Sequence, residues 1–145
     1  MSCMVKICGI NSEDAAMAAM SAGADALGYV FFPPSPRHIS LNGATTLTER
    51  VPDSILKVGL FVEAGDEALE NAIKAGRLDV IQMHGKESPE RVAEVKEKFG
   101  LRVMKAVSVS TSDDIDAAAA NFDGVADFLL FAQRKHSSRR QRRQL

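Results

Sequence analysis

Short apolar runs alternate along this chain with segments in which apolar residues recur at helical spacing. We predict helices over five of these segments: Ser12–Ala22, Leu41–Arg50, Asp66–Ala75, Pro89–Phe99 and Ser112–Ala120. The apolar runs, which resemble strands, begin near six positions: Met4, Asp25, Ile55, Asp79, Arg102 and Ala126. This regular alternation is typical of repeated βα units, and we count about six of them.

Residues that favour helix ends stand where the predicted helices begin and end. Asn11 or Ser12 is suited to cap the first helix, and Gly23 to close it. The pair Ser88-Pro89 opens the fourth helix in the order of cap then proline, and Gly100 ends it. The boundaries of these two helices are therefore predicted from local chemistry as well as from periodicity.

The predicted strands are almost continuously apolar, as in residues 26–32 and 58–62. Such strands are typical of a parallel sheet that is covered on both faces, which leaves a (β/α) barrel or a doubly wound sheet. No G-x-G-x-x-G or Walker-type loop follows any of them, so dinucleotide and nucleoside triphosphate sites have little support. We therefore predict an α/β fold of the (β/α)8 TIM-barrel type, here an incomplete barrel with about six βα units.

Composition places the chain among single-domain proteins. Its 145 residues, 46% of them hydrophobic, suffice for one ordinary core. No apolar stretch approaches the roughly 20 residues that a membrane span needs, so no membrane partner is expected. The two cysteines, Cys3 and Cys8, are too few for a disulfide framework, and no signal peptide precedes them. A reducing, cytoplasmic setting is expected.

Charge is distributed unevenly. Residues 1–131 carry 12 basic and 19 acidic side chains, whereas residues 132–145 carry six basic side chains and no acid. We therefore predict a partial barrel domain over residues 1–131 and a separate, disordered basic tail over residues 132–145. The tail has no aromatic residue for base stacking, so no specific nucleic-acid partner is expected.

Chemically active residues follow several predicted strands. Lys6 and Cys8 end the first, Arg37 follows the proline-rich loop after the second, His84 ends the fourth, and Lys105 lies in the fifth. Because a barrel gathers its chemistry at the carboxyl ends of its strands, we expect these side chains to converge on one mouth.

Each of these residues also has a simpler interpretation. Cys8 is either a base or nucleophile, or a buried cysteine acting as a small apolar residue. Arg37 is either held by its stiff loop to grip a carboxylate or phosphate, or is merely solvated. His84 is either a residue of the mouth or simply caps a strand end by hydrogen bonding. Lys6 and Lys105 are most simply explained as lysines that extend to solvent at the barrel rim.

Several ordered motifs together resemble the phosphoribosylanthranilate isomerase family of tryptophan biosynthesis. The resemblance covers residues 4–131, in the order and spacing of that family. Its motifs are residues 5–10 (VKICGI), 22–31 (AGADALGYVF), 33–37 (PPSPR), 58–62 (VGLFV), 79–85 (DVIQMHG), 103–106 (VMKA) and 126–131 (ADFLLF).

The resemblance implies an Amadori rearrangement of N-(5-phosphoribosyl)anthranilate, a small-molecule substrate, without a metal or an organic cofactor. By the same resemblance Cys8 is the base, Arg37 holds the anthranilate carboxylate, and His84 and Lys6 belong to the substrate-binding residues. Another sugar-phosphate isomerase or synthase barrel is the nearest enzymatic alternative. Outside enzymes, the alternatives are a half-barrel interaction fragment without catalysis and a nucleic-acid binder that works through the basic tail.

The chain departs from the family pattern after Phe131. The family's sixth strand ends Leu-Leu-Phe-Asp-Ala-Lys, with the aspartate as general acid, whereas Phe131 is followed here by Ala132-Gln133-Arg134. The phosphate-binding loops after the seventh and eighth strands are also missing. We interpret residues 132–145 as the product of a frameshift, and expect a truncated, poorly active form that self-associates through its open barrel edges.

Overall fold

The computed structural model describes residues 3–133, in which strands and helices alternate throughout. In chain order the elements are β1 (Lys6–Cys8), α1 (Glu13–Ser21), β2 (Ala26–Val30), α2 (Leu41–Thr48), β3 (Leu56–Phe61), α3 (Asp66–Gly76), β4 (Val80–Met83), α4 (Pro89–Phe99), β5 (Arg102–Val109), α5 (Ser112–Phe122) and β6 (Phe128–Gln133). The predicted βα repeat is confirmed, and every predicted helix boundary lies within two residues of the observed one.

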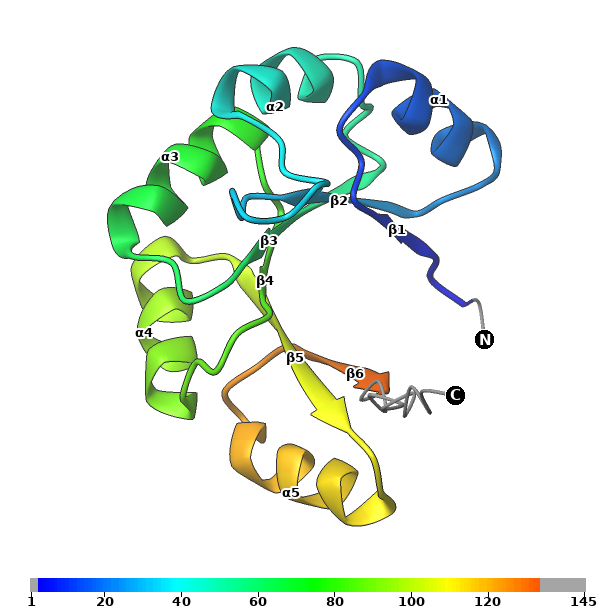
Figure 1. Cartoon of the computed structure of the whole chain (residues 1–145). Coiled ribbons are helices and arrows are strands. Elements are labelled where there is room, and N and C mark those ends of the chain that lie inside the picture. The colour runs from blue at the N-terminus through cyan, green and yellow to red at the C-terminus, as the bar shows by residue number, and fades with distance from the viewer. Residues whose placement is uncertain (1–2, 134–145) are drawn as a thin grey trace, which may run out of the picture.

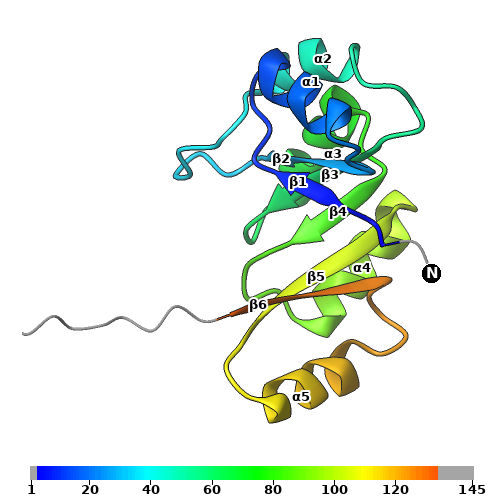
Figure 2. The ribbon, with the colours of Figure 1, turned by 90° about the vertical axis from the view of Figure 1, so that its right-hand side faces the viewer.

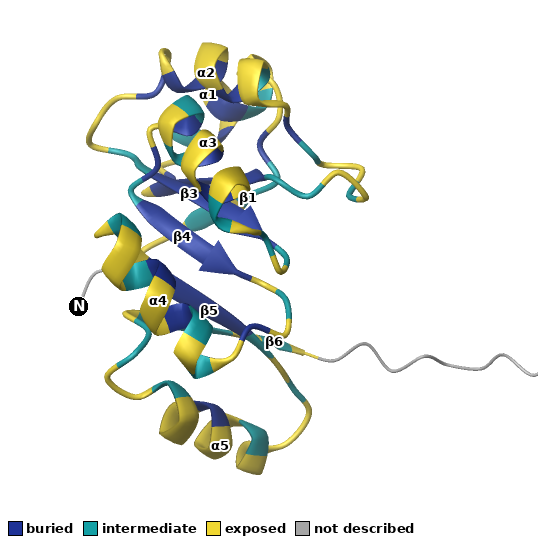
Figure 3. Cartoon of the chain, turned by 90° about the vertical axis from the view of Figure 1, so that its left-hand side faces the viewer, coloured by how far each residue is buried: buried dark blue, intermediate teal, exposed yellow. Residues whose placement is uncertain are grey.

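The six strands form one parallel sheet in the order β1-β2-β3-β4-β5-β6. The sheet curves into an arc, and the helices lie along its outer side (Figure 1). Burial follows the same layers, since the inner strands β2–β5 are largely buried whereas each helix exposes its outer face (Figure 3). The fold is therefore an incomplete (β/α) barrel, as predicted.

Local chemistry sets the helix ends. The hydroxyl oxygens of Ser12 and Ser88 accept hydrogen bonds from the backbone amides of Ala15 and Arg91, so both serines cap their helices. Gly100 ends α4 in the left-handed conformation, with a φ of 64°. Ser88 and Gly100 are the caps that the sequence predicted, and Ser12 is one of the two candidates predicted for the first helix.

Side chains of the strands alternate between two cores. Odd-numbered positions such as Leu27, Ile81 and Val103 point outward and pack beneath the helices. Even-numbered positions such as Val58 and Val80 point to the inner side, where they form a smaller apolar cluster. The inner side of the arc is therefore apolar in its middle, and the polar even-numbered residues stand near the strand ends.

An aspartate stands one residue before each even-numbered strand. Asp25, Asp79 and Asp127 accept hydrogen bonds through Oδ2 from the backbone amides of Val5, Lys57 and Val103, each at 2.8 Å. The backbone amide of each aspartate in turn donates to the carbonyl of the same partner residue, at 2.8–2.9 Å. These reciprocal bonds fasten β1 to β2, β3 to β4 and β5 to β6 at their amino-terminal ends.

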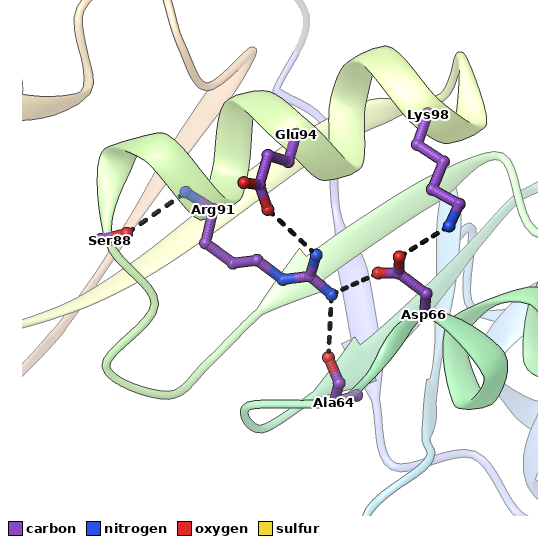
Figure 4. Close-up of polar contacts among 6 residues, drawn as sticks. All are labelled: Ala64, Asp66, Ser88, Arg91, Glu94 and Lys98. Atoms are coloured by element: carbon purple, nitrogen blue, oxygen red, sulfur yellow. Dashed lines mark hydrogen bonds and ion pairs between the residues drawn. The ribbon is translucent and has the colours of Figure 1, made fainter.

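An ion cluster joins α3 to α4 on the outer surface (Figure 4). Arg91 Nη2 donates to Asp66 Oδ1 at 2.6 Å and to the carbonyl of Ala64 at 3.2 Å, while Lys98 Nζ donates to Asp66 Oδ2 at 2.6 Å. Hydrogen bonds from Lys98 and Arg91 hold the pKa of Asp66 below its ordinary value. The first turn of α3 is thus tied to α4 by an ionised carboxylate.

The arc is open between β1 and β6, its two edge strands (Figure 2). Ile7 on β1 and Phe131 on β6 expose 40% and 41% of their surface. β6 runs through Gln133, so it includes two residues that we assigned to the basic tail. Residues 134–145, for which we predicted a disordered tail, lie outside the described residues. Within residues 3–133, no helix has the length and apolar character to cross a membrane.

Candidate active site

A cavity of about 410 Å³ opens on the inner side of the arc, near the carboxyl ends of the strands. It is lined by residues from β1, β2, β3, β4, β6 and the loops that follow them. The structure brings all four predicted site residues to this cavity: Lys6, Cys8, Arg37 and His84.

Cys8 is placed by the backbone of β2. It is the last residue of β1 and pairs with Gly28, whose carbonyl accepts hydrogen bonds from the amides of Gly9 and Ile10 at 3.0 and 2.9 Å. A Cβ atom at position 28 would lie 3.0 Å from Cα and 3.1 Å from Sγ of Cys8. Gly28 thus leaves room for the thiol, which is half-buried and borders the cavity.

Arg37 lies close to Cys8 although 29 residues separate them. Its Nη1 donates to the carbonyl oxygen of Cys8 at 3.3 Å, and its backbone amide donates to Oγ of Ser35 at 3.2 Å. Gly9 has a φ of 84°, and a Cβ there would lie 2.6 Å from Cδ and Nη1 of Arg37. The guanidinium is therefore held against the backbone of residues 8–9 at the cavity wall.

A polar chain crosses the inner side of the arc from β1 to β4. Lys6 Nζ donates to Gln82 Oε1 at 2.6 Å, and Gln82 Nε2 lies 3.2 Å from Nδ1 of His84. The side chain of Gln82 is buried, with only 1% of its surface exposed. Lys6 therefore contacts a buried amide across the sheet and does not extend to solvent at the rim.

The electrostatic environment of this cavity is positive. Burial lowers the pKa of His84, and Lys105 and Lys6 lower it further, against the opposing effect of Glu87. The lowered pKa favours the neutral form of His84, while Lys6 and Arg37 place two basic groups beside the same cavity. An anionic ligand suits this combination of two cations and a neutral imidazole.

Lys105 does not join the other predicted residues. It lines a neighbouring cavity of about 410 Å³, which it shares with His84 and Ala132. Its Nζ is buried and donates to the carbonyls of Gly85 and Ala106 at 2.7 and 2.9 Å and to Oε2 of Glu87 at 3.2 Å. The predictions that it converges with Cys8 and that it extends to solvent were both wrong, because carbonyl groups and a carboxylate satisfy the ammonium inside the protein.

Sequence reasoning missed Gln82 and Glu87. Gln82 had a detectable signal, since it is a polar residue between Ile81 and Met83 in an apolar strand. Glu87 had no such signal, because an acidic residue just before a helix cap is ordinarily expected to be solvated. It is nevertheless buried, and its Oε1 accepts a hydrogen bond from the backbone amide of Glu63 at 2.8 Å.

No group of three or more His, Cys, Asp or Glu residues within residues 3–133 is arranged to hold a metal ion. The chemistry available at the cavity is that of a thiol, an imidazole, an amide, a hydroxyl and two cations. Such a set can bind an anion and can move a proton.

Comparison with known proteins gives a consistent result. Residues 5–138 match the family model for N-(5'-phosphoribosyl)anthranilate (PRA) isomerase. The chain is 48% identical over 134 residues to N-(5'-phosphoribosyl)anthranilate isomerase of Rhodopseudomonas palustris strain HaA2, covering 92% of this chain and 61% of the relative. The corresponding protein of Paramagnetospirillum magneticum is 50% identical over 127 residues, covering 88% of this chain and 59% of the relative.

Solved structures agree with these matches. The crystal structure of phosphoribosyl anthranilate isomerase from Thermotoga maritima superposes with a TM-score of 0.84 at 32% identity, covering 94% of this chain and 64% of that one. A complex of such an isomerase with reduced 1-(o-carboxyphenylamino)-1-deoxyribulose 5-phosphate gives a TM-score of 0.82 at 32% identity, covering 92% and 66%. Monomers generated from the dimeric Thermotoga maritima protein give 0.80 at 31% identity, covering 94% and 66%. The chain spans about three fifths of the length of the two sequence relatives above.

Proposed function

This chain belongs to the N-(5'-phosphoribosyl)anthranilate isomerase family, and we propose that its Cys8 cavity binds N-(5-phosphoribosyl)anthranilate for an Amadori rearrangement in tryptophan biosynthesis. The observation that carries the proposal is the meeting of Cys8 and Arg37 at one cavity, although they come from different βα units. The substrate of this reaction is an anion, which suits the positive charge of Lys6 and Arg37.

In the proposed reaction an acid protonates the ring oxygen of the aminoaldose, and the ring opens to an iminium ion. The thiolate of Cys8 then takes the proton from C2, and the electron pair of that C–H bond neutralises the iminium to give an enolamine. Protonation of C1 and loss of the O2 proton complete the ketone. Neither a metal nor an organic cofactor is required, and the free thiol suits the reducing, cytoplasmic setting that we propose.

The other residues bind and orient the substrate. Arg37 offers a planar fork of donors that matches a carboxylate, so we assign it to the anthranilate carboxyl group. Lys6 and His84 border the same cavity and add donors for the remaining oxygens. Lys6 begins β1, and His84 directly follows β4.

The acid of the family pattern is replaced in this chain. Ala132 follows Phe131 where the family has an aspartate, and Ala132 lines the cavity next to His84. A methyl group cannot donate a proton, so the 145-residue chain lacks the acid that the family pattern supplies at this position. We therefore propose that the chain binds the substrate, keeps the base and turns over slowly.

Ligand binding and turnover test this proposal separately. The 145-residue chain should bind reduced 1-(o-carboxyphenylamino)-1-deoxyribulose 5-phosphate in a calorimetric titration, and Arg37→Ala should weaken this binding. Turnover of freshly prepared N-(5-phosphoribosyl)anthranilate should be low, should rise in Ala132→Asp and should vanish when Cys8→Ser is added. Absence of binding, or turnover in the Cys8→Ser variant equal to that of the parent, contradicts the proposal.

A second candidate function is an interaction module without catalysis. The unpaired edges of β1 and β6, with Ile7 and Phe131 exposed beside them, favour it. We propose that these edges pair between copies of the chain, because unpaired strands offer free backbone donors and acceptors. A stable oligomer that does not bind the substrate analogue would support this function over the isomerase.

A further inference from the structure

Gln82 lies between a lysine and a histidine, and this position determines which way its amide must point. An ammonium group can only donate hydrogen bonds, so the atom that faces Lys6 Nζ at 2.6 Å must be the amide oxygen. The amide nitrogen therefore faces Nδ1 of His84 at 3.2 Å. The side chain of Gln82 is itself buried, whereas Lys6 is half-buried and His84 is exposed.

The orientation of the amide then determines the proton on the imidazole. An amide NH2 group only donates, so Nδ1 of His84 must accept and cannot carry a hydrogen. The proton of the neutral ring consequently resides on Nε2. No hydrogen bond joins Nε2 to another group within residues 3–133, and the ring borders the cavities beside Cys8 and beside Lys105.

We infer that Gln82 is a positioning residue that, held by Lys6, fixes His84 as the neutral Nε2–H tautomer and presents this N–H group to the bound molecule. The ring then acts as a hydrogen-bond donor toward an anionic or carbonyl oxygen without carrying a charge of its own. That this oxygen belongs to the isomerase substrate rests on the proposed function. The assignment of the tautomer does not rest on the proposed function.

Protonation of His84 is opposed by the same arrangement. A hydrogen on Nδ1 would face the NH2 group of Gln82, and turning the amide would set NH2 against the ammonium of Lys6. Lys6 on β1, Arg37 on the loop after β2 and Lys105 on β5 add positive charge around the ring, and only Glu87 opposes them. These contacts agree with the lowered pKa of His84.

Nitrogen-15 NMR of the free protein tests the inference directly. In the chain labelled at histidine nitrogens, the ring signals of His84, assigned by their loss in His84→Gln, should be those of a neutral ring with the proton on Nε2. A neutral ring with the proton on Nδ1, or an equal mixture of both tautomers, overturns the inference. The measurement needs no substrate, so its result is independent of whether the isomerase proposal holds.

Two substitutions of similar size separate the role of the amide from that of packing. Gln82→Glu places a carboxylate beside Nδ1, so the proton should move to Nδ1 and the pKa of His84 should rise by about one unit or more. Gln82→Met keeps the volume but removes both hydrogen bonds, so both tautomers should be populated. Asn71→Asp, on the exposed face of α3, adds the same charge elsewhere and should change neither signal.

Lys6→Met provides a test that leaves Gln82 in place. Without the ammonium the amide is free to turn, and the Nδ1–H tautomer should become detectable. Circular dichroism of each variant confirms that the fold is retained. An unchanged Nε2–H tautomer in both Gln82→Glu and Lys6→Met would show that other contacts hold the ring, and the inference would be wrong.

Discussion

Nη1 of Arg37 donates a hydrogen bond to the carbonyl oxygen of Cys8 at 3.3 Å, joining the proposed carboxylate-binding group to the backbone of the proposed base. The bond links β1 to the loop after β2. The guanidinium retains further donors for a ligand, because this bond uses only one of its five N–H groups.

Replacing Arg37 should weaken ligand binding without unfolding the chain. Arg37→Lys keeps the charge but loses the planar fork, and Arg37→Ala loses both. We expect Arg37→Ala to raise the Kd of reduced 1-(o-carboxyphenylamino)-1-deoxyribulose 5-phosphate about 10- to 100-fold, which corresponds to about 1.5–3 kcal/mol, with a smaller increase for Arg37→Lys. Arg50→Ala, which removes an exposed arginine paired with Glu13, is the control and should leave the Kd unchanged.

Gly9 should tolerate no side chain. Its φ of 84° is unfavourable for other residues, and a methyl group there would lie 2.6 Å from Arg37. Gly9→Ala should therefore lower the free energy of unfolding by about 1 kcal/mol and also weaken ligand binding by displacing the guanidinium. Gly23 has a similar φ of 88°, but a Cβ there would meet no atom within 4 Å. Gly23→Ala should therefore lower the free energy of unfolding and leave ligand affinity unchanged. Equal ligand affinity in both variants would show that Gly9 does not position Arg37.

The pair formed by Glu87 and Lys105 should matter for stability more than any pair on the surface. Both side chains are buried, so Glu87→Gln leaves the ammonium without its counter-charge. We expect the free energy of unfolding to fall by about 3 kcal/mol in urea titrations. The double variant Glu87→Gln/Lys105→Met should recover part of this loss, because it also removes the buried charge. A loss as large in the double variant as the sum of the two single losses would contradict this coupling.

Acid should weaken the junction of α3 and α4. The pKa of Asp66 lies below its ordinary value of 3.8 because Lys98 and Arg91 donate hydrogen bonds to it. For a carboxyl group with a lowered pKa, the stabilisation is complete above the unfolded pKa, about pH 4, and is lost as the pH falls through the folded pKa. The urea midpoint of the parent chain should therefore drop below pH 4 more steeply than that of Asp66→Asn. Parallel curves for the two proteins would exclude this contribution.

The open edges should govern association. Ile7→Lys and Phe131→Lys place charges beside unpaired strands, which opposes edge-to-edge pairing. Sedimentation velocity should show a larger fraction of monomer for each variant than for the parent. Met17→Lys, on α1, replaces an apolar residue that is at least as exposed but lies on neither edge strand, and it should not change the distribution.

The sequence predicted the fold well because its signals are local. Apolar runs, Ser88-Pro89 and Gly100 each act within a few residues, and they determined the elements and their limits. The meeting of Cys8, Arg37 and His84 was predictable as well, since carboxyl ends of parallel strands share one edge. The remainder of the site depends on contacts between distant elements, and these leave no local pattern.

Lys105 illustrates that difference. Its burial depends on carbonyl groups of residues 83, 85 and 106 and on Glu87, which come together only after β4 and β5 pair. Gln82 was detectable in principle, because a glutamine inside an apolar strand needs partners for its amide. Which partners it finds depends on the face of the sheet to which its side chain points. Even-numbered strand residues, Gln82 among them, point to the inner side of the arc.

The three aspartates before the even-numbered strands, 54 and 48 residues apart, give the arc a modular construction. Among the residues described, these aspartate side chains join β1 to β2, β3 to β4 and β5 to β6. None of them accepts such a bond between β2 and β3 or between β4 and β5. The sheet thus contains three parallel strand pairs, β1–β2, β3–β4 and β5–β6, that share the same type of aspartate bond. Loss of one of these aspartates should therefore loosen one strand pair and leave the other two fastened.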